Sequence, residues 1–240
     1  MNGNPRYWVM IPAAGVGRRF GGQVPKQYLE LAGRMVIDHV LALFLDHPAI
    51  AGCVVALSPE DDWWASTEHA GHARVLRTDG GAERCHSVAS GLARLAGVAD
   101  DDDWVLVHDA ARPCLRLDDL DRLIAALGDE PVGALLAVPV HDTVKQSGDD
   151  RADRVAHTVP RQQLWRAFTP QAFRIALLRR ALVDAEARGL VVTDDASAVE
   201  LLGLEPRLIQ CHTDNIKITR PEDLPLAHFF LRQQAEMQPC

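Results

Sequence analysis

Short apolar segments alternate with longer amphipathic segments along the chain, and this alternation restricts the possible folds more than any other feature. The apolar segments have the length of buried strands, and the amphipathic segments have helical periodicity. Strands are predicted at 7–11, 52–57, 73–77, 104–108, 132–140 and 207–210, and helices at 35–45, 60–70, 87–95, 118–127, 173–187, 195–202 and 222–234. Alternation at this spacing predicts an α/β layer fold with a largely parallel sheet.

The length and composition predict one domain over residues 1–240. Of the 240 residues, 48% are hydrophobic and 24% are charged, which allows a sizeable core and excludes disorder as the main state. The best apolar stretch, 132–140, is shorter than the roughly 18 residues that a membrane helix requires. The N-terminus has no basic segment followed by an apolar core. We therefore expect a cytoplasmic protein without a membrane partner.

The net charge of −8 argues against a protein whose main partner is nucleic acid or an anionic membrane. The five cysteines are widely spaced and form no C-x-x-C motif, which favours free thiols in a reducing compartment. Cations are distributed unevenly, with 22 arginines but only three lysines, namely Lys26, Lys145 and Lys217. Despite the net negative charge, a small local pocket of cations could still bind phosphates.

Parallel sheets bind ligands at the carboxyl ends of their strands, so the loops after the strands are where a site is expected. The loop at 12–22 is rich in small residues but lacks the glycine spacing of a dinucleotide fingerprint. It also lacks the Gly-Lys-Ser/Thr end of a P-loop. Its backbone N–H groups can nevertheless approach a ligand closely, and Arg18, Arg19 and Lys26 add positive charge. This combination suits a nucleoside triphosphate, although a solvated surface turn has the same composition.

Further loops supply polar groups at the same edge of the predicted sheet. Asp109 follows the strand at 104–108, where a carboxylate can bind Mg²⁺ against phosphate oxygens. A glycine-bearing loop at 79–87 precedes a helix with Ser87 near its N-cap. The segment 214–223 is expected to end a strand, to start a helix at Pro221 and to supply Lys217. Thr193 stands where a helix opens, so it could cap that helix or bind a ligand.

One segment interrupts the alternation, because residues 141–161 contain little that could form a core. Its centre, 147–150, has the composition of a turn, and the flanking runs at 143–145 and 154–159 could pair as a hairpin. From the residues alone, this is either a solvated loop or an arm that packs on a partner subunit.

Six motifs together resemble, in order and spacing, the 2-C-methyl-D-erythritol 4-phosphate cytidylyltransferases. They are PAAGVGRRF at 12–20, PKQY at 25–28, GGAER at 80–84, VHDAARP at 107–113, TDDAS at 193–197 and DNIKITRPED at 214–223. The resemblance extends over residues 7 to 232. It implies a nucleotidyltransferase α/β fold, Rossmann-like, with flanking helices and a protruding dimerisation hairpin, which favours the arm over the loop at 141–161.

The resemblance also implies an activity in the non-mevalonate route to isoprenoids. The family joins CTP and methylerythritol phosphate to give 4-diphosphocytidyl-2-C-methyl-D-erythritol and diphosphate, with Mg²⁺ as cofactor. A phosphate monoester has a second pKa near ~6, so the attacking group is already largely ionised at neutral pH. Such a reaction needs preorganised positive charge and no general base.

Site residues follow from the resemblance position by position. The charge-stabilising catalytic residues would be Arg19, Lys26 and Lys217, and Asp109 would bind the metal. The nucleotide would be contacted by Ala13, Ala14, Gly15, Gly81, Arg84 and Ser87. The methylerythritol phosphate would be contacted by Arg112, Thr143, Arg161, Thr193 and Lys217, with Thr143 and Arg161 reaching the site of the other subunit in a homodimer.

Ala82 departs from the family pattern, because many relatives have Asp in the motif GGDER. The backbone groups of that loop remain, whereas one side-chain acceptor near the nucleotide is lost. Two alternatives remain at this point. One is a cytidylyltransferase for another polyol phosphate such as ribitol 5-phosphate, and the other is a regulatory module that binds CTP without turnover.

Overall fold

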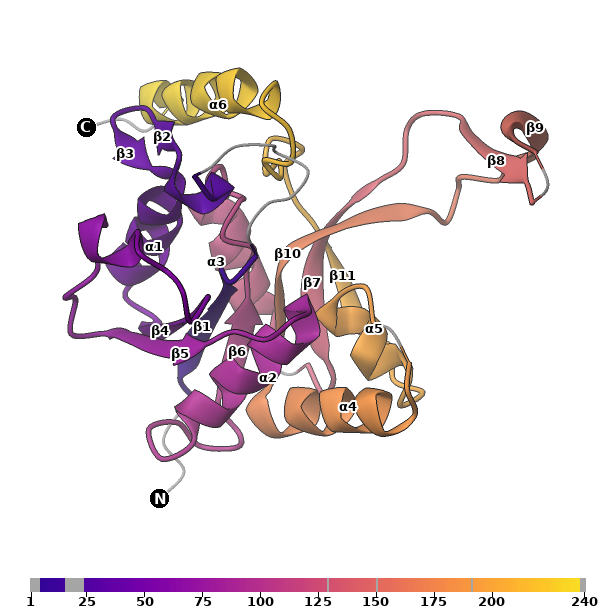
Figure 1. Cartoon of the computed structure of the whole chain (residues 1–240). Helices are drawn as coiled ribbons and strands as arrows, with labels where there is room; N and C mark the ends of the chain where they lie inside the picture. Colours follow the sequence, from indigo (N-terminus) through magenta and orange to yellow (C-terminus); the bar gives the residue numbers. More distant parts are fainter. Residues whose placement is uncertain (1–4, 16–23, 129, 150, 191, 238–240) are drawn as a thin grey trace.

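A seven-stranded sheet forms the centre of the protein in the computed structural model, which describes residues 5–15, 24–128, 130–149, 151–190 and 192–237 (Figure 1). The strands have the order β11-β7-β10-β6-β1-β4-β5. Their bounds are β1 Tyr7–Pro12, β4 Ile50–Leu57, β5 Val75–Asp79, β6 Trp104–Val107, β7 Gly133–Pro139, β10 Trp165–Arg174 and β11 Arg207–Gln210. Only β10 runs antiparallel to its neighbours, so the predicted mostly parallel α/β sheet is confirmed.

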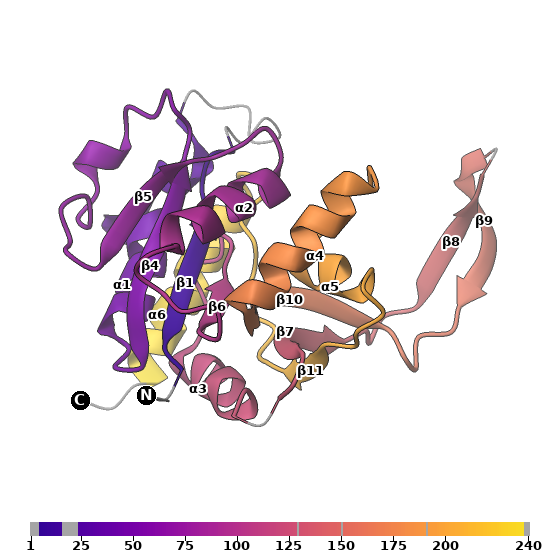
Figure 2. The same cartoon turned by 90° about the horizontal axis from the view of Figure 1, so that it is seen from below.

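Helices cover both faces of this sheet (Figure 2). Their bounds are α1 Val36–Asp46, α2 Arg84–Leu95, α3 Leu117–Ala126, α4 Ile175–Ala187, α5 Asp195–Glu200 and α6 Asp223–Met237. The alternation along β1 separates the two cores, because Val9 and Ile11 pack with α1 and α3, whereas Trp8 and Met10 pack with α2 and α4. The helix α6 packs through Ala227 on a smaller third cluster.

Two short hairpins stand apart from the main sheet. The strands β2 (Glu30–Leu31) and β3 (Arg34–Met35) pair after a 3₁₀ turn, η1 (Lys26–Tyr28). The strands β8 (Val144–Gly148) and β9 (Arg151–Val159) pair antiparallel and extend away from the sheet as an arm (Figures 1 and 2). Of the two alternatives for residues 141–161, the structure therefore shows the protruding hairpin and not the solvated loop.

Four local predictions were wrong. The segment 60–70 forms only the 3₁₀ turn η2 (Trp64–Ser66), because the Asp61 side chain accepts hydrogen bonds from the N–H groups of Trp63 and Trp64 and so holds a turn. The helix predicted from 173 begins at Ile175, since Phe173 ends the strand β10. That strand was missed because its first three residues are exposed and Pro170 interrupts the pattern.

The other two corrections concern ends of helices and strands. Ser87 is not near an N-cap position, because α2 begins at Arg84 with Glu83 as its N-cap. The segment 214–219 contains no strand, and α6 begins at Asp223, two residues after Pro221. The Asp223 side chain accepts hydrogen bonds from the N–H groups of Thr219 and Arg220, which closes the turn before the helix.

Candidate active site

A cleft of about 800 Å³ opens at the carboxyl ends of the central strands. Its walls come from the segments that follow β1, β5 and β6, together with the loop before α6 and the turn η1. The lining includes nine of the predicted site residues: Ala13, Ala14, Gly15, Lys26, Gly81, Arg84, Ser87, Asp109 and Lys217. Chain segments more than 200 residues apart in sequence therefore meet at the carboxyl ends of the strands, where a site was expected.

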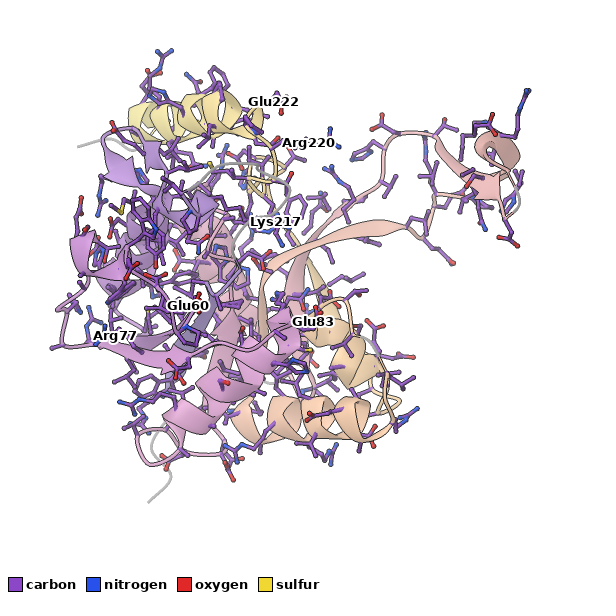
Figure 3. All side chains as sticks on the ribbon, viewed as in Figure 1. Glu60, Arg77, Glu83, Lys217, Arg220 and Glu222 are labelled. Carbon is purple, nitrogen blue, oxygen red and sulfur yellow. The ribbon has the colours of Figure 1, made fainter. Side chains whose placement is uncertain are left out.

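The loop between β5 and α2 packs so closely on the loop after β1 that glycine is required. A Cβ atom at Gly80 would lie 2.3 Å from the Cβ of Ala14, and one at Gly81 would lie 2.3 Å from the Cβ of His86. The backbone N–H of Gly81 donates to the Ser87 Oγ at 3.1 Å. Ser87, in the first turns of α2, thus holds this loop in place, and Gly81, Ala82 and Glu83 of the loop line the cleft (Figure 3, at Glu83).

Gln27 stabilises the loop after β1, which forms another wall of the cleft. It was not among the predicted site residues. Its side chain is buried, and its Nε2 donates to the carbonyl oxygens of Ala13 at 2.7 Å and Gly15 at 3.4 Å. The amide thereby fixes the path of the chain after β1. The PKQY motif contains this residue, so the motif was the signal that could have found it.

Asp109 is the electrostatic centre of the cleft. Its Oδ1 lies 3.2 Å from the Arg84 Nε, and its Oδ2 lies 3.2 Å from the Arg112 Nε and 2.9 Å from the Lys217 Nζ. Burial by itself would raise the pKa of Asp109, but the charges of these three cations outweigh it and hold the pKa well below its usual range. The carboxylate is therefore ionised at any physiological pH.

Arg84 connects Asp109 to a second acid that the sequence did not single out. Its Nη2 lies 2.8 Å from the Oδ2 of Asp195, which is 1% exposed at the start of α5. Burial would lower the pKa of Arg84, whereas the two carboxylates raise it, and the result is a raised pKa. Burial raises the pKa of Asp195 despite the nearby guanidinium. The doubled Asp of TDDAS was the available signal for this residue.

Both lysines that were predicted to act at the phosphates reach the cleft. The Lys26 Nζ donates to the carbonyl oxygen of Ile218 at 3.0 Å, which ties η1 to the loop before α6. In that loop Ile218 is fully buried, while Lys217 and Thr219 on either side of it line the cleft (Figure 3, at Lys217). Positive charge is thus placed on two walls, with the carboxylate of Asp109 between.

Not every predicted site residue lies in the cleft. Arg112 stands behind Asp109, where its guanidinium covers the Phe168 ring at 4.9 Å from the centroid. In the described part of the chain, Thr143, Arg161 and Thr193 are exposed and do not belong to the cleft lining. Arg19 lies outside the described residues. The roles assigned to these residues remain predictions.

Small residues, backbone amides and cations around one ionised carboxylate, at the carboxyl ends of a mostly parallel sheet, define a nucleotide-binding α/β enzyme of the nucleotidyltransferase class. Comparison with known proteins identifies the family. A family model described as 2-C-methyl-D-erythritol 4-phosphate cytidylyltransferase matches residues 7–233. The chain belongs to this family, as its sequence motifs predicted.

Relatives and solved structures agree with this assignment. The chain is 53% identical over 221 residues to a 2-C-methyl-D-erythritol 4-phosphate cytidylyltransferase of Pseudomonas fluorescens strain SBW25, which covers 92% of this chain and 93% of the relative. The Pseudomonas aeruginosa PAO1 relative of the same name is 52% identical, with 92% and 94% covered.

Two solved structures have the same fold over nearly their whole length. A crystal structure of 4-diphosphocytidyl-2C-methyl-D-erythritol synthase has a TM-score of 0.82 and 39% identity, covering 96% of this chain and 100% of the other. The Francisella tularensis 2-C-methyl-D-erythritol 4-phosphate cytidylyltransferase has a TM-score of 0.81 and 35% identity, covering 94% and 99%. Each of these four enzyme names contains 2-C-methyl-D-erythritol, so neither ribitol 5-phosphate as acceptor nor a module without turnover is favoured.

Proposed function

We propose that the cleft transfers the cytidylyl group of CTP to 2-C-methyl-D-erythritol 4-phosphate. A phosphate oxygen of the acceptor forms a bond to the α-phosphorus of CTP. The bond from that phosphorus to the bridging oxygen breaks, and its electron pair leaves with diphosphate. The observation that carries this proposal is the convergence of Lys26, Lys217 and the ionised Asp109 on one cleft.

Positive charge solves the main chemical problem of this reaction, which is that one anion must attack another. Lys217 would bind the acceptor phosphate and the α-phosphate, and Lys26 would bind the triphosphate. These groups are held before the substrates arrive, since Lys26 donates to Ile218 and Lys217 pairs with Asp109. Preorganised charge of this kind stabilises the transition state without reorganisation during the reaction.

No general base is needed, because the acceptor phosphate is already largely ionised at neutral pH. The described residues of the cleft lining agree with this, since they include no histidine. His108 is next to Asp109 in sequence, but it is fully buried, and burial lowers its pKa to about 4. Its ring nitrogens are occupied by Arg112 and Thr169.

Asp109 fits the role of the Mg²⁺ ligand. Mg²⁺ in phosphate-transfer sites is held by one or two carboxylates together with substrate phosphates and waters. Asp109 is an ionised carboxylate that lines the cleft, and its partners there, Lys217 and Arg84, could turn to substrate phosphates. When bound, the metal would neutralise charge on the triphosphate.

The nucleotide would lie along the loops after β1 and β5. Ala13, Ala14 and Gly15 on one side and Gly81 on the other line the cleft next to the nucleotide's proposed position. Ser87 would keep the second loop in place through its hydrogen bond to Gly81. Because Ala82 has no side-chain acceptor, recognition of the base would rely on backbone groups at this position.

The arm would complete the site of a partner subunit in a homodimer. Thr143 and Arg161 stand at the root of the hairpin, and neither is part of the cleft lining among the described residues. The hairpin projects away from the sheet, and Val155 on it is 63% exposed (Figure 2). In the proposed homodimer, a second copy of the chain would cover this side chain.

A cytoplasmic location is proposed on the chemistry of the cysteines. The four described cysteines, Cys53, Cys85, Cys114 and Cys211, are free thiols, as expected in a reducing compartment. None of the helices in the described ranges is long and apolar enough to cross a bilayer.

The test is a diphosphate-release assay with Mg²⁺ in which nucleotide and acceptor vary separately. We expect the fastest release with CTP and methylerythritol phosphate, and much slower release with ATP, GTP or UTP. Ribitol 5-phosphate is the control acceptor. Faster turnover with ribitol 5-phosphate than with methylerythritol phosphate would reject the proposed acceptor, and equal turnover with all nucleotides would reject the proposed donor.

A further inference from the structure

Four residues form a closed ring of hydrogen bonds behind the cleft. The His108 Nε2 lies 3.0 Å from the carbonyl oxygen of Arg112, and the Arg112 Nη1 lies 2.8 Å from the carbonyl oxygen of Asn215. The Asn215 Nδ2 lies 2.7 Å from the carbonyl oxygen of Thr169, and the Thr169 Oγ1 lies 3.1 Å from the His108 Nδ1. Each residue thus contacts the next, and the fourth returns to the first.

The chemistry of the groups fixes the direction of every bond. A carbonyl oxygen only accepts, so the His108 Nε2 carries a proton and donates to Arg112. In the neutral imidazole the Nδ1 is then an acceptor, and it takes the hydroxyl proton of Thr169. This leaves the Thr169 Oγ1 free to accept the N–H of Asp109 at 3.2 Å. The four hydrogen bonds of the ring therefore have one consistent set of directions.

Three of the four members of the ring are shielded from water. His108 and Asn215 are 0% exposed and Thr169 is 4% exposed. The Phe44 ring packs edge-on against the imidazole, with 5.1 Å between the centroids. Breaking one member would leave buried polar groups of its neighbours unpaired, so the ring is expected to hold its geometry as a unit.

The ring joins the two chain segments that carry Asp109 and Lys217, and it does so through β10. His108 and Arg112 belong to the segment after β6 that holds Asp109, and Thr169 belongs to β10. Asn215 belongs to the loop before α6, two residues before Lys217. The Ile218 N–H also donates to the carbonyl oxygen of Ala111 at 2.8 Å, so the ring adds side-chain hydrogen bonds to a direct backbone bond between the segments of Asp109 and Lys217.

We propose that His108, Thr169 and Asn215 are positioning residues that set the separation of Asp109 and Lys217 before substrate binds. None of the three touches the cleft, so they act through the residues beside them. This inference rests on the proposed roles of Asp109 and Lys217. A substrate phosphate that draws Lys217 away from Asp109 would break their ion pair, and the ring would then keep the two groups in place.

The first test compares Thr169→Val with Thr169→Ser in the full-length protein. Valine keeps the shape and removes the hydroxyl, whereas serine keeps the hydroxyl. We expect Thr169→Val to lower kcat by about 10-fold to 100-fold, the loss caused by misplacing a reacting group by about 1 Å. It should raise the KM for methylerythritol phosphate and leave the KM for CTP nearly unchanged, because the nucleotide loops lie on other segments. Thr169→Ser should recover most of the activity.

Thr67→Val is the matched control for loss of a buried hydroxyl. Thr67 is 7% exposed, its Oγ1 donates to the carbonyl oxygen of Trp64 at 2.8 Å, and neither residue lines the cleft. It should lower the Tm about as much as Thr169→Val does and leave kcat and both KM values unchanged. The proposal is overturned if Thr169→Val behaves in the same way, with a lower Tm and unchanged kinetics.

A double-mutant cycle tests whether the ring acts as a unit. His108→Phe keeps an aromatic ring against Phe44 and removes both hydrogen bonds of the imidazole. We expect its kinetic defect to resemble that of Thr169→Val and the double variant to be little worse than either single variant, because both break the same ring. Additive losses would show that the two residues act separately and would overturn the proposal that the ring acts as a unit. If Thr169→Val does not fold, the kcat and KM values of His108→Phe are compared with those of wild type, and unchanged values overturn the proposal.

Failure of this inference differs from failure of the proposed roles. Asp109→Asn and Lys217→Ala should abolish most turnover if those roles are right. If they do so while Thr169→Val and His108→Phe keep wild-type kinetics, the ring proposal fails and the proposed function stands. If Asp109→Asn and Lys217→Ala keep wild-type turnover, the proposed roles themselves fail.

Discussion

The cleft and the arm both carry predicted site residues, but they are built in opposite ways. Around the cleft, Asp109, Arg84 and Arg112 are largely buried and held by ion pairs of 3.2 Å. On the arm, the contacts are exposed, such as the ion pair of Arg154 with Asp153 at 3.7 Å. Exposed ion pairs contribute little to stability, whereas buried networks hold their groups in one geometry.

This difference indicates how the work is divided between the two regions. The cleft is preorganised within one chain, because the sheet and the buried polar contacts fix its charged groups. None of the described residues of the arm is buried, so they would gain a fixed position only against another surface. Mutations in the cleft should therefore affect chemistry, and mutations in the arm should affect substrate binding and assembly.

Lys26→Ala should have the largest effect on turnover. Loss of one preorganised charge at the phosphates should lower kcat by about 10²-fold to 10³-fold. Steady-state diphosphate release measures this. Lys145→Ala is the matched control, because Lys145 is an exposed lysine on the arm that donates to the Thr158 Oγ1 at 2.7 Å, and it should retain kcat. Equal losses for both lysines would contradict the contrast between cleft and arm.

Arg161→Ala should affect the acceptor far more than the nucleotide. A charged hydrogen bond contributes roughly 1.5–3 kcal/mol, so the KM for methylerythritol phosphate should rise by about 10-fold to 100-fold. The KM for CTP should change little, because Arg161 lies outside the cleft lining among the described residues. Similar changes in both KM values would place Arg161 at the nucleotide and remove the proposed role of the arm.

Val155→Asp should weaken the proposed homodimer. A carboxylate placed in an apolar interface must be desolvated without a partner, so the dissociation constant measured by analytical ultracentrifugation should rise by roughly 10-fold to 100-fold. Val183→Asp is the control, since Val183 on α4 is 60% exposed and Val155 is 63% exposed. A monomeric wild-type protein, or equal effects of both variants, would contradict dimerisation through the arm.

Asp103→Asn should change stability and leave catalysis nearly intact. Burial would raise the pKa of Asp103, but hydrogen bonds from the Arg6 N–H, the Asp100 N–H and the Trp8 Nε1 lower it below its usual range. Because the folded pKa is depressed, Asp103 stabilises the protein above the unfolded pKa of about 3.9, and this contribution is lost as the pH falls through the folded pKa.

The loss in free energy of unfolding for Asp103→Asn should therefore be full near pH 7 and shrink below about pH 4. Urea unfolding at several pH values measures it, and kcat at pH 7 should stay within about twofold of wild type. A large loss of kcat would show that buried acid networks away from the cleft also control the chemistry. This would weaken the contrast between the cleft and the arm.

Periodicity found most of the strands and helices because each segment must bury one face, and this leaves a pattern in the sequence. It failed where a single residue overrides the pattern, as Asp61 does in the turn at η2. It also missed β10, whose antiparallel pairing with β6 and β7 depends on neighbours distant in sequence. The motifs located nine residues of the cleft, but they did not indicate that Gln27 and Asp195 support them.

The sequence by itself determined the α/β fold class, the family and the loops that carry the proposed phosphate-binding groups. These follow from local hydrophobic pattern and from residue types at fixed spacing, which are properties of the chain alone. Only the tertiary structure decided that Asp109 lies among three cations and that His108, Arg112, Asn215 and Thr169 close a ring. Charge and hydrogen bonding act over a few ångströms, so they depend on where folding places residues that are far apart in sequence.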